Sequence, residues 1–264
     1  MIGLFDSGLG GLSVWLECIK LLPDENYVYF SDSKNCPYGN KPIEFIQKRS
    51  IEITDFLIAK GADIIVCACN TATAAVIDIL REKYTIPFVG IEPAIKSAVF
   101  HSNTGVVGIL ATANTLKGVK YHNTLERFAS NIEVIEEKGT GLVEFVERGE
   151  VDSKKVETLL YSYLKPMMEK NIDSLVLGCT HYPFLINPII RIVGPNVIII
   201  NPAPAVAQQT KRLLEKLSAD PKNYNNLNNK GNTDFYTNGD VELMKKFLKT
   251  ISKNEYKIYN LTKK

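Results

Sequence analysis

The sequence lacks a long apolar run. No stretch approaches the roughly 18 consecutive apolar residues that a helix needs to cross a bilayer. A secretory leader is also not expected, because Asp6 and neighbouring glycines interrupt the apolar stretch that opens the chain. We therefore expect a protein of the cytoplasm with no membrane partner.

An excess of charge of one sign is lacking too. Lysine and arginine total 31 against 29 aspartates and glutamates, so the formal net charge is +2. A balanced charge gives no electrostatic reason to expect binding to nucleic acid or to an acidic membrane. We expect a small-molecule ligand and no nucleic acid partner.

Cysteines are few, and their number is odd, without the regular spacing of a secreted disulfide framework. The five are Cys18, Cys36, Cys67, Cys69 and Cys179. Reduced thiols are therefore predicted, and some of them are candidates for chemistry. Cys18 and Cys67 lie among apolar neighbours and are interpreted as core, whereas Cys36 is either incidental or an accessible thiol outside catalysis.

Familiar cofactor-binding loops are also lacking. Residues 6–11, DSGLGG, follow the first apolar stretch but match neither the G-x-G-x-x-G dinucleotide loop nor the GxxxxGK[ST] phosphate loop. No lysine has the context of a Schiff base. We expect no cofactor and no metal, and the glycines are either structural or lead backbone amides towards a ligand.

Short apolar runs alternate with stretches of helical periodicity, which predicts an α/β fold with mainly parallel sheets. With 45% hydrophobic residues in 264, the chain can bury a substantial core. The predicted strands are 2–5, 27–31, 64–67, 88–91, 105–110, 132–136, 175–177 and 197–200, with a short one at 234–236.

The two halves of the chain repeat in order. Residues 62–71, ADIIVCACNT, resemble 172–181, IDSLVLGCTH, and residues 86–94 are echoed by 195–203. We predict two similar parallel-sheet α/β domains related by pseudo-symmetry, formed by residues 1–95 with 206–264 and by residues 96–205. Ligands bind beyond the carboxyl ends of such strands, so the active site is expected in the cleft between the domains.

The polar segment 218–238 is expected to be a surface loop around the short strand. The segment that follows has Leu243, Met244, Phe247, Leu248 and Ile251 at helical spacing with lysines between them. It is predicted to be an amphipathic helix with a solvated basic face.

Cys69 and Cys179 each stand between a buried strand and the start of a helix. Backbone amides and the helix dipole at such a position are expected to lower the pKa of a thiol. Asn70 or Thr71 is expected to cap the first helix. One such cysteine alone is most often a small buried residue. A pair in matching repeats, with His181 close to the second, favours acid–base chemistry.

Four motifs resemble the signatures of bacterial glutamate racemases, in the aspartate/glutamate racemase family. They are DSGLGG at 6–11, PYG at 37–39, CNTA at 69–72 and GCTHYP at 178–183, and the similarity runs nearly end to end. The resemblance implies cofactor-independent interconversion of L- and D-glutamate, which supplies D-glutamate for peptidoglycan.

The resemblance assigns Cys69 and Cys179 as the two acid–base thiols. The matching positions for binding or orienting the substrate are Asp6, Ser7, Tyr38, Gly39, Asn70, Thr71, Thr115, Thr180 and His181. Glu147 matches an auxiliary acid, although residues 142–147 depart from the usual pattern and leave its role open. Spacing alone favours Thr115 over Thr112.

Other interpretations remain open at this point. The substrate is aspartate if the racemase belongs to the other branch of the family. Cys67, Cys69, Cys179 and His181 are alternatively ligands of a structural zinc, although Cys-x-Cys is not the usual knuckle spacing. A third alternative, a non-catalytic amino-acid sensor, does not explain two facing thiols. A monomer and a homodimer are equally compatible with the sequence.

Overall fold

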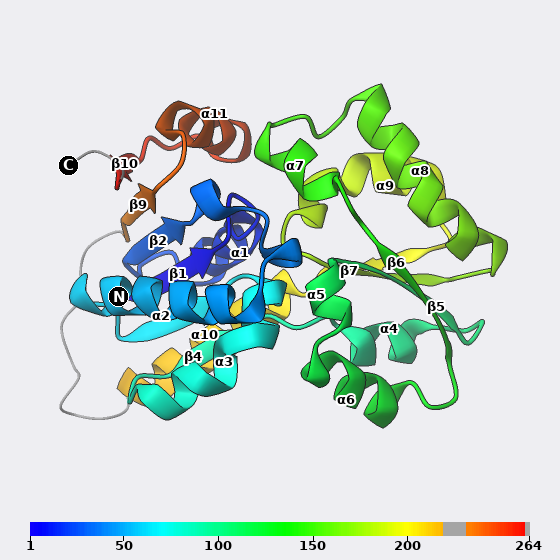
Figure 1. Ribbon diagram of the computed structural model, residues 1–264, viewed down its shortest axis with the longest axis horizontal. Helices are drawn as coiled ribbons and strands as arrows, with labels where there is room; N and C mark the ends of the chain where they lie inside the picture. Colours follow the sequence, from blue (N-terminus) through cyan, green and yellow to red (C-terminus); the bar gives the residue numbers. More distant parts are fainter. Residues whose placement is uncertain (219–230, 262–264) are drawn as a thin grey trace.

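The computed structural model describes residues 1–218 and 231–261, and its strands form two separate sheets, here called A and B. Sheet A contains β1 (Ile2–Asp6), β2 (Tyr27–Ser31), β3 (Ile64–Cys67), β4 (Phe88–Gly90), β9 (Thr233–Thr237) and β10 (Lys257–Asn260). Sheet B contains β5 (Val106–Ala111), β6 (Glu133–Lys138), β7 (Ser174–Gly178) and β8 (Ile198–Ile200). The two sheets lie in two lobes side by side (Figure 1).

All strand pairs are parallel, and the internal repeat appears in the strand order. Sheet A runs β10-β9-β2-β1-β3-β4 and sheet B runs β6-β5-β7-β8. The order β2-β1-β3-β4 thus recurs as β6-β5-β7-β8, with β9 and β10 added to sheet A alone. The prediction of two similar parallel-sheet α/β domains is confirmed.

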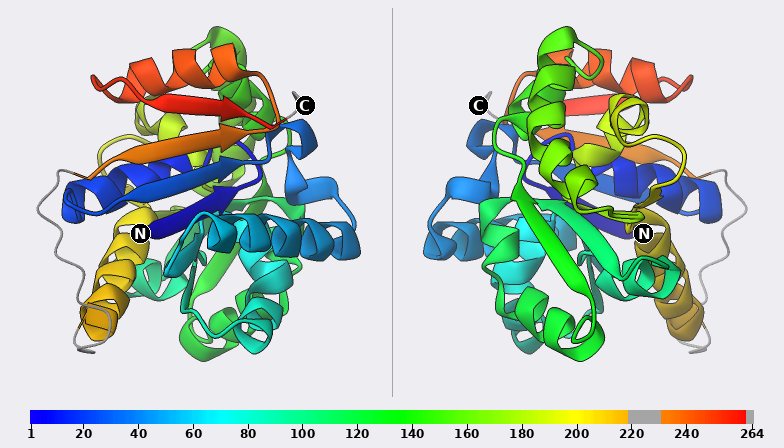
Figure 2. Two further views of the ribbon diagram at one scale, coloured as in Figure 1. Left: turned by 90° about the vertical axis from the view of Figure 1, so that its left-hand side faces the viewer. Right: turned by 90° about the vertical axis from the view of Figure 1, so that its right-hand side faces the viewer.

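Helices cover both faces of each sheet. Those around sheet A are α1 (Leu12–Leu21), α2 (Ile43–Ala59), α3 (Asn70–Lys83), α10 (Ala203–Ser218) and α11 (Val241–Ile251). Those around sheet B are α4 (Ile95–His101), α5 (Ala113–Leu116), α6 (Val119–Phe128), α7 (Leu142–Glu147), α8 (Lys154–Glu169) and α9 (Ile186–Val193). Short 3₁₀ turns are η1 (Ser33–Asn35), η2 (Tyr38–Asn40) and η3 (Tyr182–Leu185). Each domain therefore has three layers, with α1 and α10 opposite α2 in the left view of Figure 2.

The alternation of side chains along β1 explains why its sheet is covered on both faces. Ile2 and Leu4 join the apolar cluster that contains Trp15 of α1, whereas Phe5 joins the cluster that contains Leu57 of α2. Successive residues of a strand point to opposite faces, so a strand that is apolar throughout needs a helix layer on each side.

The predicted strands are confirmed: 27–31 and 64–67 match the structure at both ends, and no end of the others differs by more than two residues. The predicted C-terminal helix is α11, with Met244, Phe247 and Leu248 buried and Lys245 exposed. Much of the predicted polar loop, residues 219–230, lies outside the described residues. The sequence did not predict β10, because it has four residues of which two are exposed, and it pairs only with β9 at the sheet edge.

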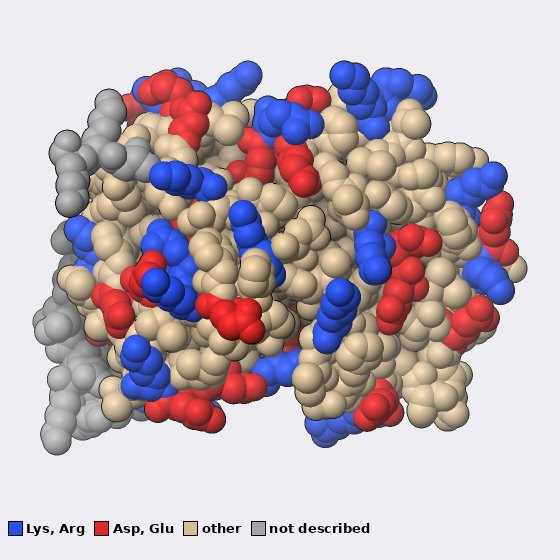
Figure 3. Space-filling model, in the orientation of Figure 1, with Lys and Arg blue, Asp and Glu red and all other residues tan. Residues whose placement is uncertain are grey.

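The surface carries both charge signs. On the face drawn in Figure 3, lysine and arginine side chains are interspersed with aspartate and glutamate side chains, as the balanced composition predicts. Among the described helices, none combines the length and the apolar character needed to cross a membrane.

Candidate active site

The carboxyl ends of β3 and β7 face one small pocket between the two domains. Cys69 follows β3 and Cys179 follows β7, and both thiols line this pocket with only 5% and 6% of each residue exposed. The complete lining is Ser7, Pro37, Tyr38, Gly39, Cys69, Asn70, Thr71, Thr112, Val143, Cys179, Thr180 and His181. Each sheet therefore contributes one buried thiol to a shared pocket.

Cys69 is itself the N-cap of α3. Its backbone is extended, and its Sγ accepts a hydrogen bond from the N–H of Ala72 at 3.4 Å. The thiol also lies 3.8 Å from Oγ of Ser7. The expectation that Asn70 or Thr71 caps this helix is therefore wrong, because the sulfur occupies the capping position and the next two residues are already helical.

The expected lowering of the pKa is wrong for Cys69. Burial raises the pKa of this thiol well above its ordinary value, and the nearby Asp6 and Cys67 add to the effect. The amide of Ala72 opposes the shift but is outweighed, because desolvation of a buried thiolate costs more than one hydrogen bond returns. Burial therefore favours the protonated, uncharged form of the Cys69 thiol.

Cys179 has a different partner, the imidazole of His181. The Nδ1 atom of His181 lies 3.7 Å from Sγ of Cys179, and Nε2 lies 2.7 Å from Oε1 of Glu147. Burial by itself lowers the pKa of His181, but the contacts with Cys179, Cys36 and Glu147 raise it well above its usual value. A protonated ring donates to Glu147 from Nε2 and directs Nδ1–H at the sulfur, which stabilises negative charge there.

Two glycines of the 6–11 loop allow this arrangement. A Cβ atom on Gly10 would lie 2.2 Å from Nδ1 of His181, and a Cβ atom on Gly8 would lie 2.2 Å from Oε1 of Glu147. The backbone uses the space, since Leu9 N–H donates to Oε1 of Glu147 at 2.6 Å and Gly10 N–H lies 3.2 Å from Nε2 of His181. The absence of side chains at Gly8 and Gly10 therefore lets Glu147 and His181 of the second domain pack against the backbone of this loop.

Asn70 presents the least satisfied polar group of the pocket. Both its Oδ1 and its Nδ2 are buried and have no hydrogen-bond partner among the described residues. A buried amide left in this state costs about 1–3 kcal/mol. A ligand that offers both a donor and an acceptor beside Cys69 would satisfy both atoms.

Three threonines form a cluster beside Asn70. Oγ1 of Thr71 lies 2.9 Å from that of Thr112, which in turn lies 2.9 Å from that of Thr115. Thr112 lines the pocket, whereas Thr115 sits behind it and lines a neighbouring hollow. Thr112 and Thr115 therefore both lie at or near the site, whereas the spacing in the sequence pointed to Thr115 alone.

The family model of Asp/Glu/Hydantoin racemases matches residues 16–210. The chain belongs to this family. A glutamate racemase of Methylococcus capsulatus is 47% identical over 214 residues, which are 81% of this chain and 79% of that protein.

Solved structures of family members have the same fold. A glutamate racemase isoform of Bacillus anthracis aligns with a TM-score of 0.87 at 31% identity, covering 99% of this chain and 97% of that one. The glutamate racemase of Escherichia coli, solved with L-glutamate and an activator, aligns with a TM-score of 0.85 at 30% identity over 98% of both chains. The resemblance that the four motifs predict is confirmed.

Most predicted site residues of this racemase-family chain line the pocket. They are Ser7, Tyr38, Gly39, Cys69, Asn70, Thr71, Cys179, Thr180 and His181. Asp6 lies behind the pocket, where burial raises the pKa of its carboxyl group; its Oδ2 accepts a hydrogen bond from Thr180 at 3.2 Å. Glu147 lies on the outer side of His181, and Thr115 behind Thr112.

Asp32 is a neighbour that the sequence did not point out. It is fully buried, accepts a hydrogen bond from the Tyr38 hydroxyl at 2.6 Å, and pairs with Arg49 at 2.9 Å. It holds Tyr38, which lines the pocket. Its place directly after β2, beside β1 in the sheet, was a usable signal, because strand carboxyl ends gather functional groups.

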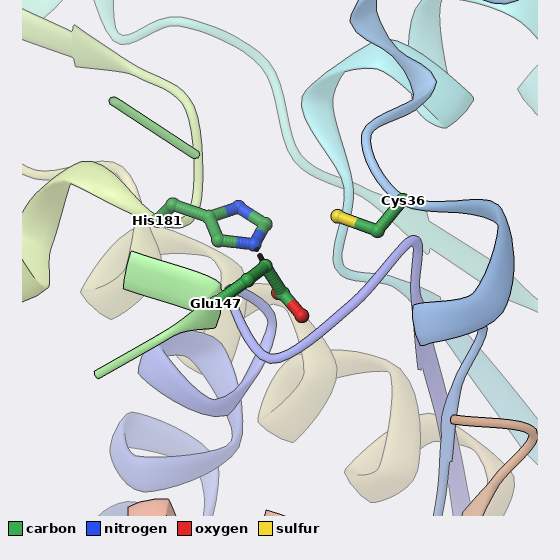
Figure 4. Close-up of side chains that lie close together, drawn as sticks. All are labelled: Cys36, Glu147 and His181. Atoms are coloured by element: carbon green, nitrogen blue, oxygen red, sulfur yellow. Dashed lines mark hydrogen bonds and ion pairs between the residues drawn. The ribbon is translucent and has the colours of Figure 1, made fainter. Parts of the chain in front are cut away.

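The structure does not assemble the alternative zinc set of Cys67, Cys69, Cys179 and His181. Cys67 packs in the apolar core, where burial raises its thiol pKa to about 12, and its Sγ faces the carbonyl of Cys69. Cys18 is buried as predicted. Within the described residues, the metal-binding types cluster elsewhere, at Cys36, Glu147 and His181 (Figure 4).

Proposed function

We propose that this chain interconverts L- and D-glutamate by exchanging the α-proton between Cys69 and Cys179, with no cofactor. One observation carries the proposal: the two thiols follow equivalent strands of two different sheets and line one pocket. Inversion of a stereocentre needs a base on one face and an acid on the other, which two thiols on opposite walls provide. The relatives' name, glutamate racemase, supports the substrate.

The acid and base roles follow from the partners of each thiol. In the L-to-D direction the thiolate of Cys179 removes the α-proton and the thiol of Cys69 returns one to the opposite face; the roles reverse from D to L. The raised pKa of Cys69 keeps its proton in place, and the imidazolium of His181 stabilises the charge on Cys179. Glu147 holds the ring in position.

The carbanion formed between the two steps needs stabilisation. Ser7, Asn70, Thr71 and Thr180 line the pocket with hydroxyl and amide groups that can bind the carboxylate and ammonium groups of the substrate. Such preorganised donors lower a barrier by several kcal/mol because they need not reorient during the reaction. Asp6 orients Thr180, and Tyr38 and Gly39 complete the wall.

The setting of the reaction is part of the proposal. D-glutamate made here would serve peptidoglycan synthesis in the cytoplasm. The proposed domains are residues 1–95 with 206–264 and residues 96–205, a division supported by the pairing of β9 with β2. Sedimentation equilibrium decides between a monomer and a homodimer.

The mechanism is tested with Cys69→Ser and Cys179→Ser. Purified protein is incubated with L-glutamate and no added cofactor, and loss of circular dichroism and exchange of the α-proton with deuterated solvent are followed together. Loss of both racemisation and α-proton exchange in each variant agrees with a mechanism in which both thiols transfer the proton. Full activity in either variant rejects it.

The substrate is tested by comparing the turnover of D-glutamate with that of D-aspartate under identical conditions. We expect glutamate to be the faster substrate by a wide margin. Equal turnover, or faster turnover of aspartate, would assign the chain to the aspartate branch.

A further inference from the structure

Three side chains with different metal-binding atoms converge beside the pocket. Cys36 follows η1, Glu147 ends α7, and His181 follows β7, so they come from three separate segments. One ligand atom of each lies within 4.8 Å of the others. In Figure 4 the sulfur of Cys36 faces the ring of His181, with the carboxylate of Glu147 beside both.

The cluster can be reached without passing through the pocket between the two thiols. Cys36 and Glu147 line a second hollow of about 300 Å³, and Cys36 is only partly buried. Carboxylates of Glu144 and Asp240 also line this hollow, against one guanidinium, that of Arg148. Three carboxylates against one basic group favour the entry of a cation over that of an anion.

We propose that Cys36, Glu147 and His181 form a binding site for a thiophilic divalent cation, zinc above all, and that its occupation inhibits the enzyme. A thiolate, an imidazole and a carboxylate are the ligands that zinc takes, and the hollow leaves a fourth position for water. Cys36 neither gives nor takes the transferred proton in the function proposed above, and its sulfur reaches the cluster through its contact with His181.

The geometry needs small adjustments only. Zinc bonds of about 2.0–2.3 Å in a tetrahedron place ligand atoms roughly 3.3–3.8 Å apart. Nε2 of His181 and Oε1 of Glu147, now 2.7 Å apart, would separate, and the Cys36 sulfur would approach. Cys36 binds as a thiolate and releases its proton to solvent. If Nε2 of His181 carries a proton, that proton is also released, because the metal binds the lone pair of Nε2.

Inhibition follows because the same ring contacts Cys179. Coordination replaces the hydrogen bond between His181 and Glu147 and draws the ring towards Cys36, away from a sulfur now 3.7 Å from Nδ1. A displacement of about 1 Å in such a group can reduce a rate by about 100-fold. This inhibition depends on the proposed function, whereas the binding of the cation does not.

Cobalt(II) tests the binding without any activity measurement. Metal-free full-length protein titrated with cobalt(II) should develop a thiolate-to-cobalt charge-transfer band that saturates at one equivalent and disappears when zinc is added. Cys36→Ser should abolish the band, while the matched variants Cys69→Ser and Cys179→Ser keep it. Absence of the band in the wild type, or its survival in Cys36→Ser and loss in Cys69→Ser, overturns the site.

Racemisation supplies the second readout. Zinc should lower the rate of the wild type by about 100-fold. The rate of Cys36→Ser, compared with the rate of the same variant without metal, should be nearly unaffected. Equal sensitivity of the two proteins to zinc contradicts the inhibition. A protein that shows the cobalt band but does not racemise glutamate would reject the proposed function and leave the metal site standing.

Discussion

Single residues of this pocket depend on one another through direct contacts. His181 contacts Cys179 with one ring nitrogen and Glu147 with the other, and Gly10 lies against the ring with no room for a side chain. The position of the imidazole is therefore fixed from three sides. A change at any of them should act on Cys179 through His181.

Gly10→Ala tests this coupling. The added Cβ would meet the His181 ring at 2.2 Å, so the ring must move and the rate should fall by about 100-fold. In a His181→Ala background the same change should cost little more, since the clash is gone. The measurement is a double-mutant cycle on kcat/KM, with melting curves to show that the variants fold. Additive losses in the cycle would contradict the coupling.

Asn70→Leu should separate stability from activity. Replacing two buried unpartnered polar atoms by an apolar group of similar size should raise the free energy of unfolding by about 1 kcal/mol or more. Activity should fall by about 100-fold or more, because a donor to the substrate is lost. Urea denaturation and a racemisation assay measure the two effects, and a less stable variant with full activity would refute this role of Asn70.

Among the elements, the two junctions between strand and helix match in position and differ in construction. After β3 the sulfur of Cys69 caps a helix of 14 residues, whereas after β7 a 3₁₀ turn of 4 residues separates Cys179 from the start of α9. Cys69 therefore receives a backbone amide, and Cys179 receives the His181 ring. This asymmetry is consistent with the proposal that Cys69 donates the proton and Cys179 removes it in the L-to-D direction.

The capping role of Cys69 predicts different stabilities for two variants that should both lose activity. Cys69→Ser keeps an acceptor for the Ala72 amide, and serine is a good capping residue, so stability should be retained. Cys69→Ala removes the acceptor and should lower the free energy of unfolding by about 1 kcal/mol. Urea denaturation of the two variants compares them directly. Equal stability would mean that the sulfur contributes nothing as a cap.

The internal repeat made the strands and both thiols predictable from sequence, because residues 62–71 and 172–181 place a cysteine at equivalent positions after equivalent strands. The cap of α3 and the pKa of Cys69 were not predictable in the same way, because both depend on how deeply the sulfur is buried. Cys36 and Glu147 lie far apart in the sequence and in segments without a strong pattern. Only the packing of the two domains brings them together.

At the scale of the whole molecule, the chain buries several thiols that must remain uncharged. Burial raises the pKa of Cys18 and of Cys67 to about 12 and that of Cys69 well above its ordinary value. In the unfolded chain each of them titrates near about 8.5. The folded protein therefore binds more protons than the unfolded chain above that pH.

Stability should consequently fall in alkaline solution. The contribution of these thiols is complete below about pH 8 and is lost as pH rises, by up to about 1.4 kcal/mol per pH unit for each thiol. Urea denaturation at pH 8, 9 and 10 measures the slope. Cys18→Ala should make this slope shallower by up to about 1.4 kcal/mol per pH unit, the contribution of one thiol. A free energy of unfolding that stays constant to pH 10 would contradict the account.

The central claim is that two thiols act on opposite faces of the substrate. Its most direct test follows the incorporation of deuterium at the α-carbon of glutamate during the first turnovers in deuterated water. If Cys179 removes the proton and Cys69 supplies another from the opposite side, D-glutamate formed from L-glutamate carries deuterium from the start, while the remaining L-glutamate stays unlabelled. Mass spectrometry of the separated enantiomers measures both. Early label in the L-glutamate pool, or product that retains the original hydrogen, would mean that one group acts on both faces.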